Sequence, residues 1–463
     1  MRRAKIVCTV GPASSDPETL RRMVEAGMDV ARLNMSHGDH GTHARTAERI
    51  REAAGAAGRP VAILLDLAGP KIRLGALPEP RLVHAGDELV LGPEGSGAEI
   101  PVNYPQLASE LEPGDRISLA DGAIPLEVVA VQGDAVRVRV IAGGTITSHK
   151  GLNLPGKGDA LPAVSEKDRE DLRFGLRIGV DWVALSFVRS PKDLDPAREV
   201  MDQEGVRVPV LAKIEKRQAL ARLGEILDVF DGLMVARGDL GVEVDLEEVP
   251  GIQKRLIREA NRRAKPVVTA TQMLLSMVTN PRPTRAEVTD VANAVLDGTD
   301  AVMLSEETAM GRYPVEAVRV MARIVERAEA DAPEPEECRP LVAEGVPAAI
   351  ARATWHVARD VGAKAIVTPT RSGSTARLVA ATRPPVPVLG MTSDPATAGA
   401  LALTWGVTPA LVPPAPTTDA LFDACRREVV RRGIARPGDR VVVTAGVPVD
   451  TPGTTNLLKV LEV

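Results

Sequence analysis

The feature that most constrains the fold of this chain is a repeated alternation of short apolar runs with segments of helical period. The apolar runs are, in order, KIVCTVG, VARLNMSHG, VAILLDLAG, WVALSF, VPVLAKIE, GLMVARGD, PVVTATQM and AVMLSEET. Runs that are apolar on both faces are typical of buried parallel strands, and segments such as PETLRRMVEAG between them repeat at helical spacing. Eight parallel strands alternating with helices predict an α/β fold, the (β/α)8 TIM barrel. An open doubly wound sheet is the alternative, but the count of eight and the lack of a G-x-G-x-x-G after the first run disfavour it.

Two segments depart from the barrel pattern. From about Lys71 to Pro155 no long helical period appears, and alternating runs such as AVRVRVI predict a small all-β insertion. Because the insertion follows the third strand, it leaves from the face that carries the strand ends and could close over a substrate as a lid. After the linker APEPEECRP the chain alternates again, which predicts a separate open α/β domain. The expected division is barrel 1–70 and 156–333, lid 71–155, and C-terminal domain 340–463.

Composition excludes several classes of function. The net charge of -5 leaves no basic footprint for nucleic acid. The apolar runs are strand-sized, far short of a membrane span or a signal peptide's apolar region. The cysteines Cys8, Cys338 and Cys425 are odd in number and far apart, so neither a disulfide framework nor a zinc site is indicated. We expect a soluble cytoplasmic protein without nucleic-acid or membrane partners.

Charged residues close the fifth and sixth runs. Lys213 and Glu215 end VPVLAKIE, and Asp239 follows GLMVARG, with RQALARLGEILDVF between them at helical spacing. Glu215 and Asp239 then lie at the ends of neighbouring parallel strands, close enough to share one divalent cation beside Lys213. Oxygen ligands of this kind suit Mg²⁺ or Mn²⁺ better than zinc. The alternative for an isolated Lys-x-Glu is a surface salt-bridge cluster.

Polar residues also close other runs. The second run ends on Arg32, Asn34, Ser36 and His37, the third on Asp66, and the seventh on Thr271 and Gln272. A Thr271 hydroxyl could relay a proton or bind a carboxylate, or it could bond its own backbone. His37, His40 and His43 do not share one helix face, so a three-histidine metal site is disfavoured and His37 alone is the better candidate for contacting a substrate.

Three further segments need interpretation. GLNLPGKG resembles a P-loop, but Gly158 stands where the metal-binding hydroxyl belongs, and the flanking strand and helix are absent. The helical segment RAEVTDVANAVL predicts a buried face, made of Val288, Val291, Ala292, Val295 and Leu296.

In the last domain, a hydroxyl-rich turn between a strand and a helix could bind phosphate, or could be a simple N-cap cluster. Its residues are Thr370, Arg371, Ser372, Gly373, Ser374 and Thr375. The terminal loop AGVPVDTPGTTN could form another wall of that pocket.

Blocks spread along the chain resemble those of pyruvate kinases, in the same order and over essentially the full length. They are ARLNMSHG, LDLAGPKIR, KGLNLPG, LPAVSEKD, LAKIE, ARGDLGVE, TATQML, RPTRAE, DVANAVLDGTDAVMLSEETA and GTTN. The resemblance implies a barrel with a β lid and an α/β effector domain, and phosphoryl transfer from phosphoenolpyruvate to ADP in the last step of glycolysis. It also implies a phosphorylated allosteric effector and a homotetramer.

The resemblance also implies roles for the strand-end residues. Glu215 and Asp239 would hold the Mg²⁺ or Mn²⁺, and Lys213 and Arg32 would neutralise the transferring phosphoryl group. Backbone N–H groups around Ala236, Gly238 and Asp239 would receive the substrate carboxylate, and Thr271 would lie near the proton-delivery side of the enolate. The nucleotide and phosphoryl side would be formed by Asn34, His37, Arg73 and Lys150, with Asp121 on the lid.

One block departs from the family pattern. Many relatives read D-T-K-G-P-E where this chain reads DLAGPK, so Leu67 removes a hydroxyl ligand for potassium and Lys71 brings a tethered ammonium. Activity without K⁺ is therefore expected, as in a K⁺-independent subgroup of the bacterial type. The monovalent-cation region comprises Asn34, Ser36, Asp66, Leu67 and Lys71. Two smaller departures, Glu306 and Met310, have no assigned effect.

Two other functions compete with this interpretation. A Mg²⁺-dependent lyase of the aldolase kind would stabilise the same pyruvate enolate with paired carboxylates, but it leaves the β lid and Lys150 unexplained. A non-catalytic effector-binding protein is disfavoured because it would not require the full set of site residues, namely Arg32, Lys213, Glu215, Asp239 and Thr271.

Overall fold

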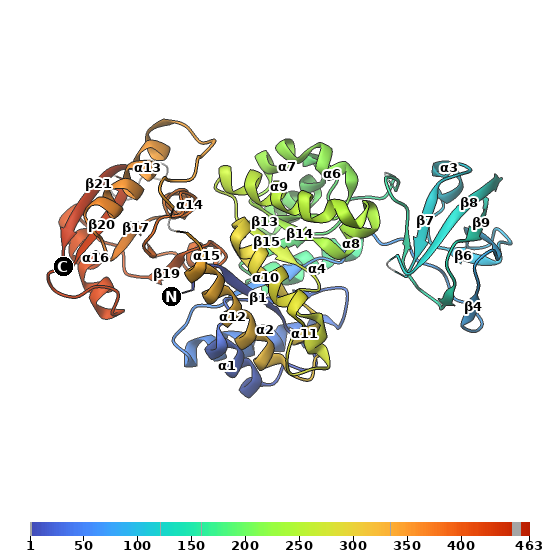
Figure 1. The fold of residues 1–463 in the computed structure, drawn as a ribbon, viewed down its shortest axis with the longest axis horizontal. Coiled ribbons are helices and arrows are strands. Elements are labelled where there is room, and N and C mark those ends of the chain that lie inside the picture. The colour runs from blue at the N-terminus through green and yellow to red at the C-terminus, as the bar shows by residue number, and fades with distance from the viewer. Residues whose placement is uncertain (1, 121, 159, 334, 447–454) are drawn as a thin grey trace.

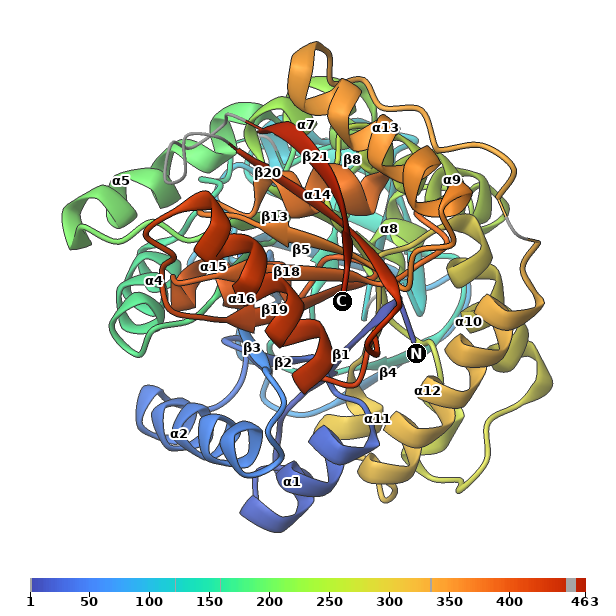
Figure 2. The same cartoon turned by 90° about the vertical axis from the view of Figure 1, so that its left-hand side faces the viewer.

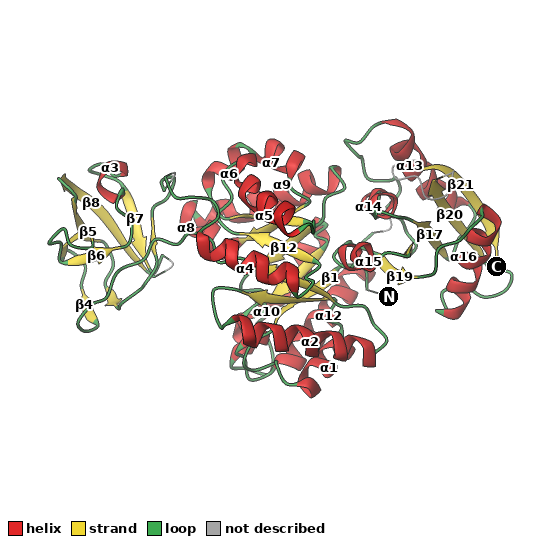
Figure 3. Cartoon of the chain, turned by 180° about the vertical axis from the view of Figure 1, so that it is seen from behind, coloured by secondary structure: helices red, strands yellow, loops and turns green. Residues whose placement is uncertain are grey.

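The computed structural model describes residues 2–120, 122–158, 160–333, 335–446 and 455–463. Three parts follow one another along the long axis, with the barrel in the middle, the β lid at one end and the C-terminal domain at the other (Figure 1). The view from behind shows that the N-terminus lies at the barrel end that faces the C-terminal domain (Figure 3). This arrangement confirms the predicted fold class.

The barrel strands are parallel and buried on both faces. They close in the order β1-β16-β15-β14-β13-β12-β3-β2. Their bounds are β1 Lys5–Thr9, β2 Val30–Asn34, β3 Ala62–Asp66, β12 Trp182–Leu185, β13 Val210–Ile214, β14 Gly232–Ala236, β15 Val267–Ala270 and β16 Ala301–Leu304. Because all eight run in one direction, their C-terminal residues meet at a single mouth, which faces the lid.

Helices surround the strands, as the view along the molecule shows (Figure 2). They are α1 Pro17–Ala26, α2 His40–Ala56, α4 Glu166–Arg177, α5 Asp195–Glu204, α6 Arg217–Ala221, α7 Leu223–Val229, α8 Arg237–Glu243, α9 Val249–Arg262, α10 Arg285–Asp297, α11 Glu306–Ala309 and α12 Pro314–Asp331, with the 3₁₀ helices η1 Pro191–Leu194, η2 Leu246–Glu248 and η3 Leu275–Val278. Local sequence sets their ends. At α1 the Asp16 side chain accepts the Thr19 N–H at 2.9 Å, and Gly27 ends the helix at φ 125°.

Two predictions about helices were wrong. The segment after Glu215 forms two helices rather than one, with a break at Arg222. Gly224 follows that break, and a glycine disfavours a helix interior by about 1 kcal/mol relative to alanine. In α10, Val291 and Ala294 are buried, but Val288 and Leu296 are 37% and 54% exposed, because the buried stripe is narrower than the apolar pattern.

The lid is a separate β structure with its own core. A six-stranded sheet has the order β11-β7-β8-β9-β5-β6, and β10 pairs with β4. The bounds are β4 Arg81–Val83, β5 Glu88–Pro93, β6 Ile100–Val102, α3 Leu107–Glu110, β7 Arg116–Leu119, β8 Ile124–Gln132, β9 Ala135–Val140, β10 Gly144–Ile146 and β11 Leu152–Asn153. In β9 the valines Val136, Val138 and Val140 are buried while the intervening arginines face solvent, as their alternation predicts.

The C-terminal domain is an open α/β sheet of order β19-β18-β17-β20-β21. Its elements are α13 Gly345–Asp360, β17 Ala365–Pro369, α14 Ser374–Ala381, β18 Val388–Thr392, α15 Pro395–Leu401, β19 Val407–Leu411, α16 Thr418–Arg431, β20 Arg440–Gly446 and β21 Thr455–Glu462. Sequence reasoning missed α15, β19 and β21. α15 is short, Pro409 interrupts the pattern of β19, and β21 is an antiparallel edge strand without clear alternation.

The C-terminal domain closes the barrel end opposite the mouth. Ala402 and Leu403 join the apolar cluster that fills the barrel interior. Trp182, at the start of β12, donates its indole N–H to the Ala400 carbonyl at 3.2 Å. Within the described residues, no helix combines the length and apolarity that crossing a membrane requires.

Candidate active site

Side chains from the strand ends and from the lid line a cavity of about 500 Å³ at the barrel mouth. It is lined by Arg32, Asn34, Ser36, His37, Asp66, Lys71, Arg73, Lys150, Ser186, Phe187, Lys213, Glu215, Ala236, Asp239, Thr271 and Ser305, among others. Residues chosen from separate runs of the sequence thus lie together at one mouth. Gly238 and Leu67 do not line this cavity, and Leu67 is fully buried in the barrel wall.

Lys213 is fixed by three polar partners. Its ammonium lies 3.2 Å from Asp66 Oδ1 and 3.1 Å from Glu215 Oε1, and it donates to the Ser186 hydroxyl at 2.7 Å. Burial alone would lower the pKa of Lys213, but the two carboxylates outweigh it and raise the pKa above its ordinary value. Lys213 therefore presents a permanent positive charge at the cavity floor.

Asp66 joins the two cations of the site. Arg32 donates from Nε to Asp66 Oδ2 at 2.7 Å and from Nη1 to the Thr9 hydroxyl at 2.9 Å. Burial favours the neutral acid, but Lys213 and Arg32 outweigh that and hold the pKa of Asp66 below its usual range. The carboxylate that was predicted for a monovalent-cation region is engaged with Arg32 and Lys213.

Glu215 and Asp239 supply carboxylate oxygens on neighbouring elements. Glu215 is 1% exposed, and its Oε2 accepts the Phe187 N–H at 2.7 Å. Burial raises the pKa of Glu215, Lys213 opposes the shift, and the nearby charge of Asp239 adds to it. Asp239 lies in the first turn of α8, with the Lys71 ammonium 4.0 Å from its Oδ1.

This donor set fits a hard divalent cation. Besides burial, the negative charge of Asp239 raises the pKa of Glu215, and a cation bound between the two carboxylates would relieve their repulsion. Among the described residues, no group of three or more His, Cys, Asp or Glu side chains is arranged to hold a metal. Mg²⁺ is commonly bound by one or two carboxylates, with substrate and water oxygens in the remaining positions, whereas zinc prefers His and Cys ligands.

Thr271 combines an unusual backbone with an engaged hydroxyl. Its φ is 69°, and that of Gln272 is 56°, in the left-handed region that is uncommon for such residues. The Thr271 hydroxyl accepts the Gly238 N–H at 2.9 Å and donates to the Ala270 carbonyl at 2.7 Å. The hydroxyl thus bonds backbone, which was one of the two expectations, and it holds the first turn of α8.

The three histidines do not converge on a metal. His40 Nε2 lies 2.7 Å from Asp171 Oδ1 and its ring stacks on Phe174, while His43 Nε2 donates to the His37 carbonyl at 2.8 Å. Of these three, His37 is the one that lines the cavity, where His149 of the lid also lies. The disfavoured three-histidine site is therefore absent from the described residues.

The lid contributes Arg73 and Lys150 to the cavity, and Arg73 donates to the His149 carbonyl at 3.0 Å. The segment before Gly158 forms the two-residue strand β11 and a turn, and the next described helix, α4, begins only at Glu166, so the strand–loop–helix arrangement of a P-loop is not formed by the described residues. Asp121 lies outside the described residues.

Sequence reasoning missed Ser186 and Phe187, which contact Lys213 and Glu215. Both follow WVAL in the fourth apolar run, so their place at a strand end was the available signal.

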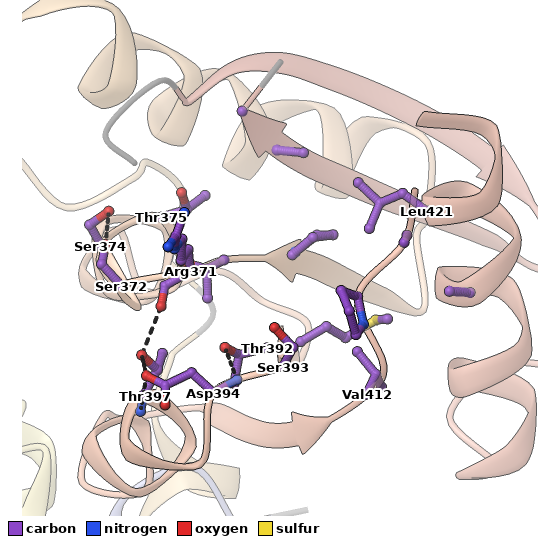
Figure 4. Close-up of a pocket in the computed structure, with 18 of the residues that line it drawn as sticks. Arg371, Ser372, Ser374, Thr375, Thr392, Ser393, Asp394, Thr397, Val412 and Leu421 are labelled. Atoms are coloured by element: carbon purple, nitrogen blue, oxygen red, sulfur yellow. Dashed lines mark hydrogen bonds between the residues drawn. The ribbon is translucent and has the colours of Figure 1, made fainter. Parts of the chain in front are cut away.

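A second cavity, of about 790 Å³, lies in the C-terminal domain. Thr370, Arg371, Ser372, Ser374 and Thr375 line one side of it, and Gly373 precedes α14 at φ 77°. Asp394 and Thr397 line the opposite side, and the Thr397 hydroxyl donates to the Arg371 carbonyl at 2.8 Å (Figure 4). Residues 447–454 of the terminal loop, proposed as another wall, lie outside the described residues.

Comparisons with known proteins agree with this architecture. The family model described as pyruvate kinase, barrel domain, matches residues 1–318, and that described as pyruvate kinase, alpha/beta domain, matches residues 348–461. The pyruvate kinase of Corynebacterium glutamicum is 49% identical, covering 99% of this chain and 97% of that protein. That of Mycobacterium tuberculosis is 48% identical, covering 99% and 98%.

A crystal structure of a pyruvate kinase from Cryptosporidium parvum superposes with a TM-score of 0.92 at 36% identity, covering 100% of this chain and 96% of that one. Similarity of this extent spans all three parts of the molecule. The chain belongs to the pyruvate kinase family.

Proposed function

We propose that this protein transfers the phosphoryl group of phosphoenolpyruvate to ADP, giving ATP and pyruvate. The observation that carries the proposal is the pair of cations Arg32 and Lys213 fixed on the buried Asp66, directly beside Glu215. Positive charge held in place before the substrate arrives needs no reorganisation when the phosphoryl group moves. In phosphoryl transfer such positioning supplies most of the catalysis.

The charged and polar residues proposed for the mouth have distinct roles in this scheme. Arg32 and Lys213 stabilise the negative charge that spreads over the phosphoryl oxygens during transfer. Mg²⁺ or Mn²⁺ held by Glu215 and Asp239 would neutralise charge on the substrate oxygens as a Lewis acid. Arg73 and Lys150 on the lid, with Asn34 and His37 on the barrel, face the nucleotide side.

The first turn of α8 receives the substrate carboxylate. N–H groups at a helix start lack intrahelical partners, and those of Ala236 and Asp239 would face the carboxylate, while the Gly238 N–H between them donates to the Thr271 hydroxyl and fixes the turn. Thr271 anchors that turn through Gly238 and lies on the side where the enolate carbon takes up its proton.

Lys71 replaces the monovalent cation. Its ammonium lines the cavity 4.0 Å from Asp239, so it supplies the positive charge that potassium supplies in relatives with Glu at this place. Activity therefore does not require K⁺. The test is a pyruvate and ATP assay with phosphoenolpyruvate, ADP and Mg²⁺, run with and without K⁺.

Absence of both products would rule out the kinase, and carbon–carbon cleavage without nucleotide would favour the lyase instead. Lys71→Glu should create a K⁺ requirement, whereas Lys192→Glu, at an exposed lysine of η1 outside the cavity, should not. A wild-type requirement for K⁺ would overturn the role of Lys71 and leave the kinase intact.

The C-terminal cavity binds a phosphorylated activator. The hydroxyls and N–H groups at the start of α14 suit a phosphate, with Arg371 among the lining residues. Ser374→Asp, which adds a negative charge at that helix start, should weaken activation by a sugar phosphate or a nucleoside monophosphate about tenfold. Thr418→Asp makes the same change at the start of α16 and should have no such effect.

The chain also assembles as a homotetramer in this proposal, as the family resemblance implies. Sedimentation should give a mass four times the 49.0 kDa of the chain. A monomer at assay concentration would contradict it.

A further inference from the structure

Phe187 has a backbone conformation that a bulky residue adopts rarely. It follows β12 at the barrel mouth with a φ of 55°, in the left-handed region. Such conformations cluster at functional sites, where the surrounding structure holds them in place. At Phe187 the consequence is that its N–H points at Glu215 Oε2, 2.7 Å away. The backbone of Phe187 therefore orients one of the two carboxylates proposed to hold the divalent cation.

The ring of Phe187 packs on the chain segment that leads into the lid. A Cβ at Gly69 would meet the ring at 2.9 Å and the Ser186 side chain at 2.7 Å, and Gly69 has a φ of 70°. Only glycine fits this close approach without displacing the ring. The residues that start the lid connection thus lie directly against Phe187.

Two residues further along, Lys71 places its ammonium over the same ring. Its Nζ is 5.6 Å from the ring centroid and 4.0 Å from Asp239 Oδ1. An aromatic face attracts a cation at this range. Lys71 is therefore held between the ring of Phe187 and the carboxylate of Asp239, rather than by Asp239 alone.

We propose that Phe187 is a positioning residue, whose ring holds the Lys71 ammonium at 4.0 Å from Asp239 Oδ1, beyond hydrogen-bond distance, while its N–H orients Glu215. This inference rests on the proposed function, because it assigns Phe187 to the same phosphoryl-transfer site. It couples the lid connection at Gly69 and Lys71 to both carboxylates. Without the ring, the ammonium would close on Asp239 and compete with the divalent cation for that oxygen.

The experiment measures binding of Mn²⁺ alone, by electron paramagnetic resonance, to the full-length protein and to Phe187→Leu. Leucine keeps apolar bulk but has no aromatic face, so Mn²⁺ should bind about fivefold more weakly to the variant. Phe187→Tyr keeps the face and should bind as the wild type does. The matched control is Phe174→Leu, which removes the ring stacked on His40 at a centroid distance of 4.2 Å, and it should leave Mn²⁺ binding unchanged.

A double-mutant cycle identifies the route of the effect. In a Lys71→Met background the ammonium is gone, so Phe187→Leu should cause little further loss of Mn²⁺ affinity. In the wild-type background the same variant should also make the activity respond to K⁺. Additive effects in the cycle, or Mn²⁺ affinity unchanged in folded Phe187→Leu, would overturn the proposal.

The two proposals can fail separately. If the wild type makes no ATP from phosphoenolpyruvate and ADP, the proposed function falls, while the Mn²⁺ cycle still reports on Phe187 and Lys71. Near-ultraviolet circular dichroism tests whether Phe187→Leu is folded. If it is not, Phe187→Tyr and Phe187→Met in the same cycle decide the question, since only tyrosine should preserve the Mn²⁺ affinity.

Discussion

The two ends of the barrel carry similar clusters of buried charge but are covered differently. At the mouth, Asp66 lies between Arg32 and Lys213 on the floor of an open cavity. At the opposite end, Asp29 lies 2.7 Å from the Arg2 guanidinium, and its Oδ2 accepts the Ile6 N–H at 2.8 Å. Burial would raise the pKa of Asp29, but Arg2 and Lys5 outweigh it, so the pKa is lowered as it is for Asp66.

The difference lies in what each cluster faces. Ala402 and Leu403 of the C-terminal domain pack into the closed end, whereas the mouth opens toward the lid. In barrels of this kind, residues at the strand C-termini carry chemistry and those at the N-termini carry stability. The comparison teaches that one type of ion cluster serves either purpose, according to whether a neighbouring domain seals it.

The largest expected effect is at the mouth. Lys213→Met removes the ammonium that faces the phosphoryl group, so kcat/KM for phosphoenolpyruvate should fall about a thousandfold. Lys265→Met is the control at the other end, where the ammonium donates to the Phe230 carbonyl at 2.7 Å, and it should change the rate less than twofold. Steady-state kinetics check both. A Lys213→Met enzyme within tenfold of wild type would contradict the division of roles.

At the closed end, Asp29→Asn removes the carboxylate that pairs with Arg2 and the larger of the two negative charges acting on Lys5, the other being Glu329. The free energy of unfolding at pH 7 should fall by about 3 kcal/mol, as when one partner of a buried pair is removed. Because the pKa of Asp29 is depressed in the folded state, its stabilisation is present above its ordinary value of 3.8 and is lost as pH falls through the lower folded value.

The gap in unfolding free energy between wild type and Asp29→Asn should therefore narrow below about pH 4. Denaturant titrations at several pH values measure it. Asp134→Asn changes an exposed residue of the hairpin between β8 and β9, and its unfolding free energy should equal that of the wild type at every pH. A difference in unfolding free energy that stays constant at all pH values would mean that the pKa of Asp29 is not depressed, unlike that of Asp66.

The contact between the C-terminal domain and the closed end of the barrel can be tested at Gly399 in α15. A Cβ there would lie 1.9 Å from Asp181 Oδ1, so Gly399→Ala should cost about 2 kcal/mol of unfolding free energy through overpacking. Gly55→Ala in α2 has nothing within 4 Å and should instead stabilise the protein slightly. Equal effects of the two substitutions in denaturant unfolding would mean that α15 does not pack tightly on the barrel.

The smallest expected effect is the loss of a single hydrogen bond across the seal. Trp182→Phe removes the indole N–H that donates to the Ala400 carbonyl at 3.2 Å, and it should cost about 1 kcal/mol. The midpoint of denaturant unfolding should fall, while kcat and KM stay near wild-type values. A substantial fall in kcat/KM in the folded variant would show that a change at the closed end affects catalysis at the mouth.

Much of the architecture was predictable because periodicity is local. Alternating strand and helix patterns predict the barrel, and each polar residue after an apolar run is expected at the mouth once the strands are parallel. Arg32, Lys213 and Glu215 follow directly from that rule. Ser186 and Phe187 obey it as well, but a serine and a phenylalanine attract no attention without their contacts.

Patterns also misled where packing decided the outcome. The apolar face of α10 included Val288 and Leu296, yet these two side chains remain 37% and 54% exposed. The sequence left two roles for the Thr271 hydroxyl, a catalytic or binding role and a hydrogen bond to its own backbone. Only the structure showed its partners, the Ala270 carbonyl and the Gly238 N–H.

The sequence by itself determined the order of the barrel strands, the insertion of the lid after the third strand and the set of charges delivered to one mouth. Only the tertiary structure decided how those charges pair: Asp66 with Arg32 and Lys213, and Lys71 between Phe187 and Asp239. The physical reason is that propensity and periodicity act between near neighbours in the chain. These ion pairs join residues brought together by barrel closure, where burial and distance select the partners.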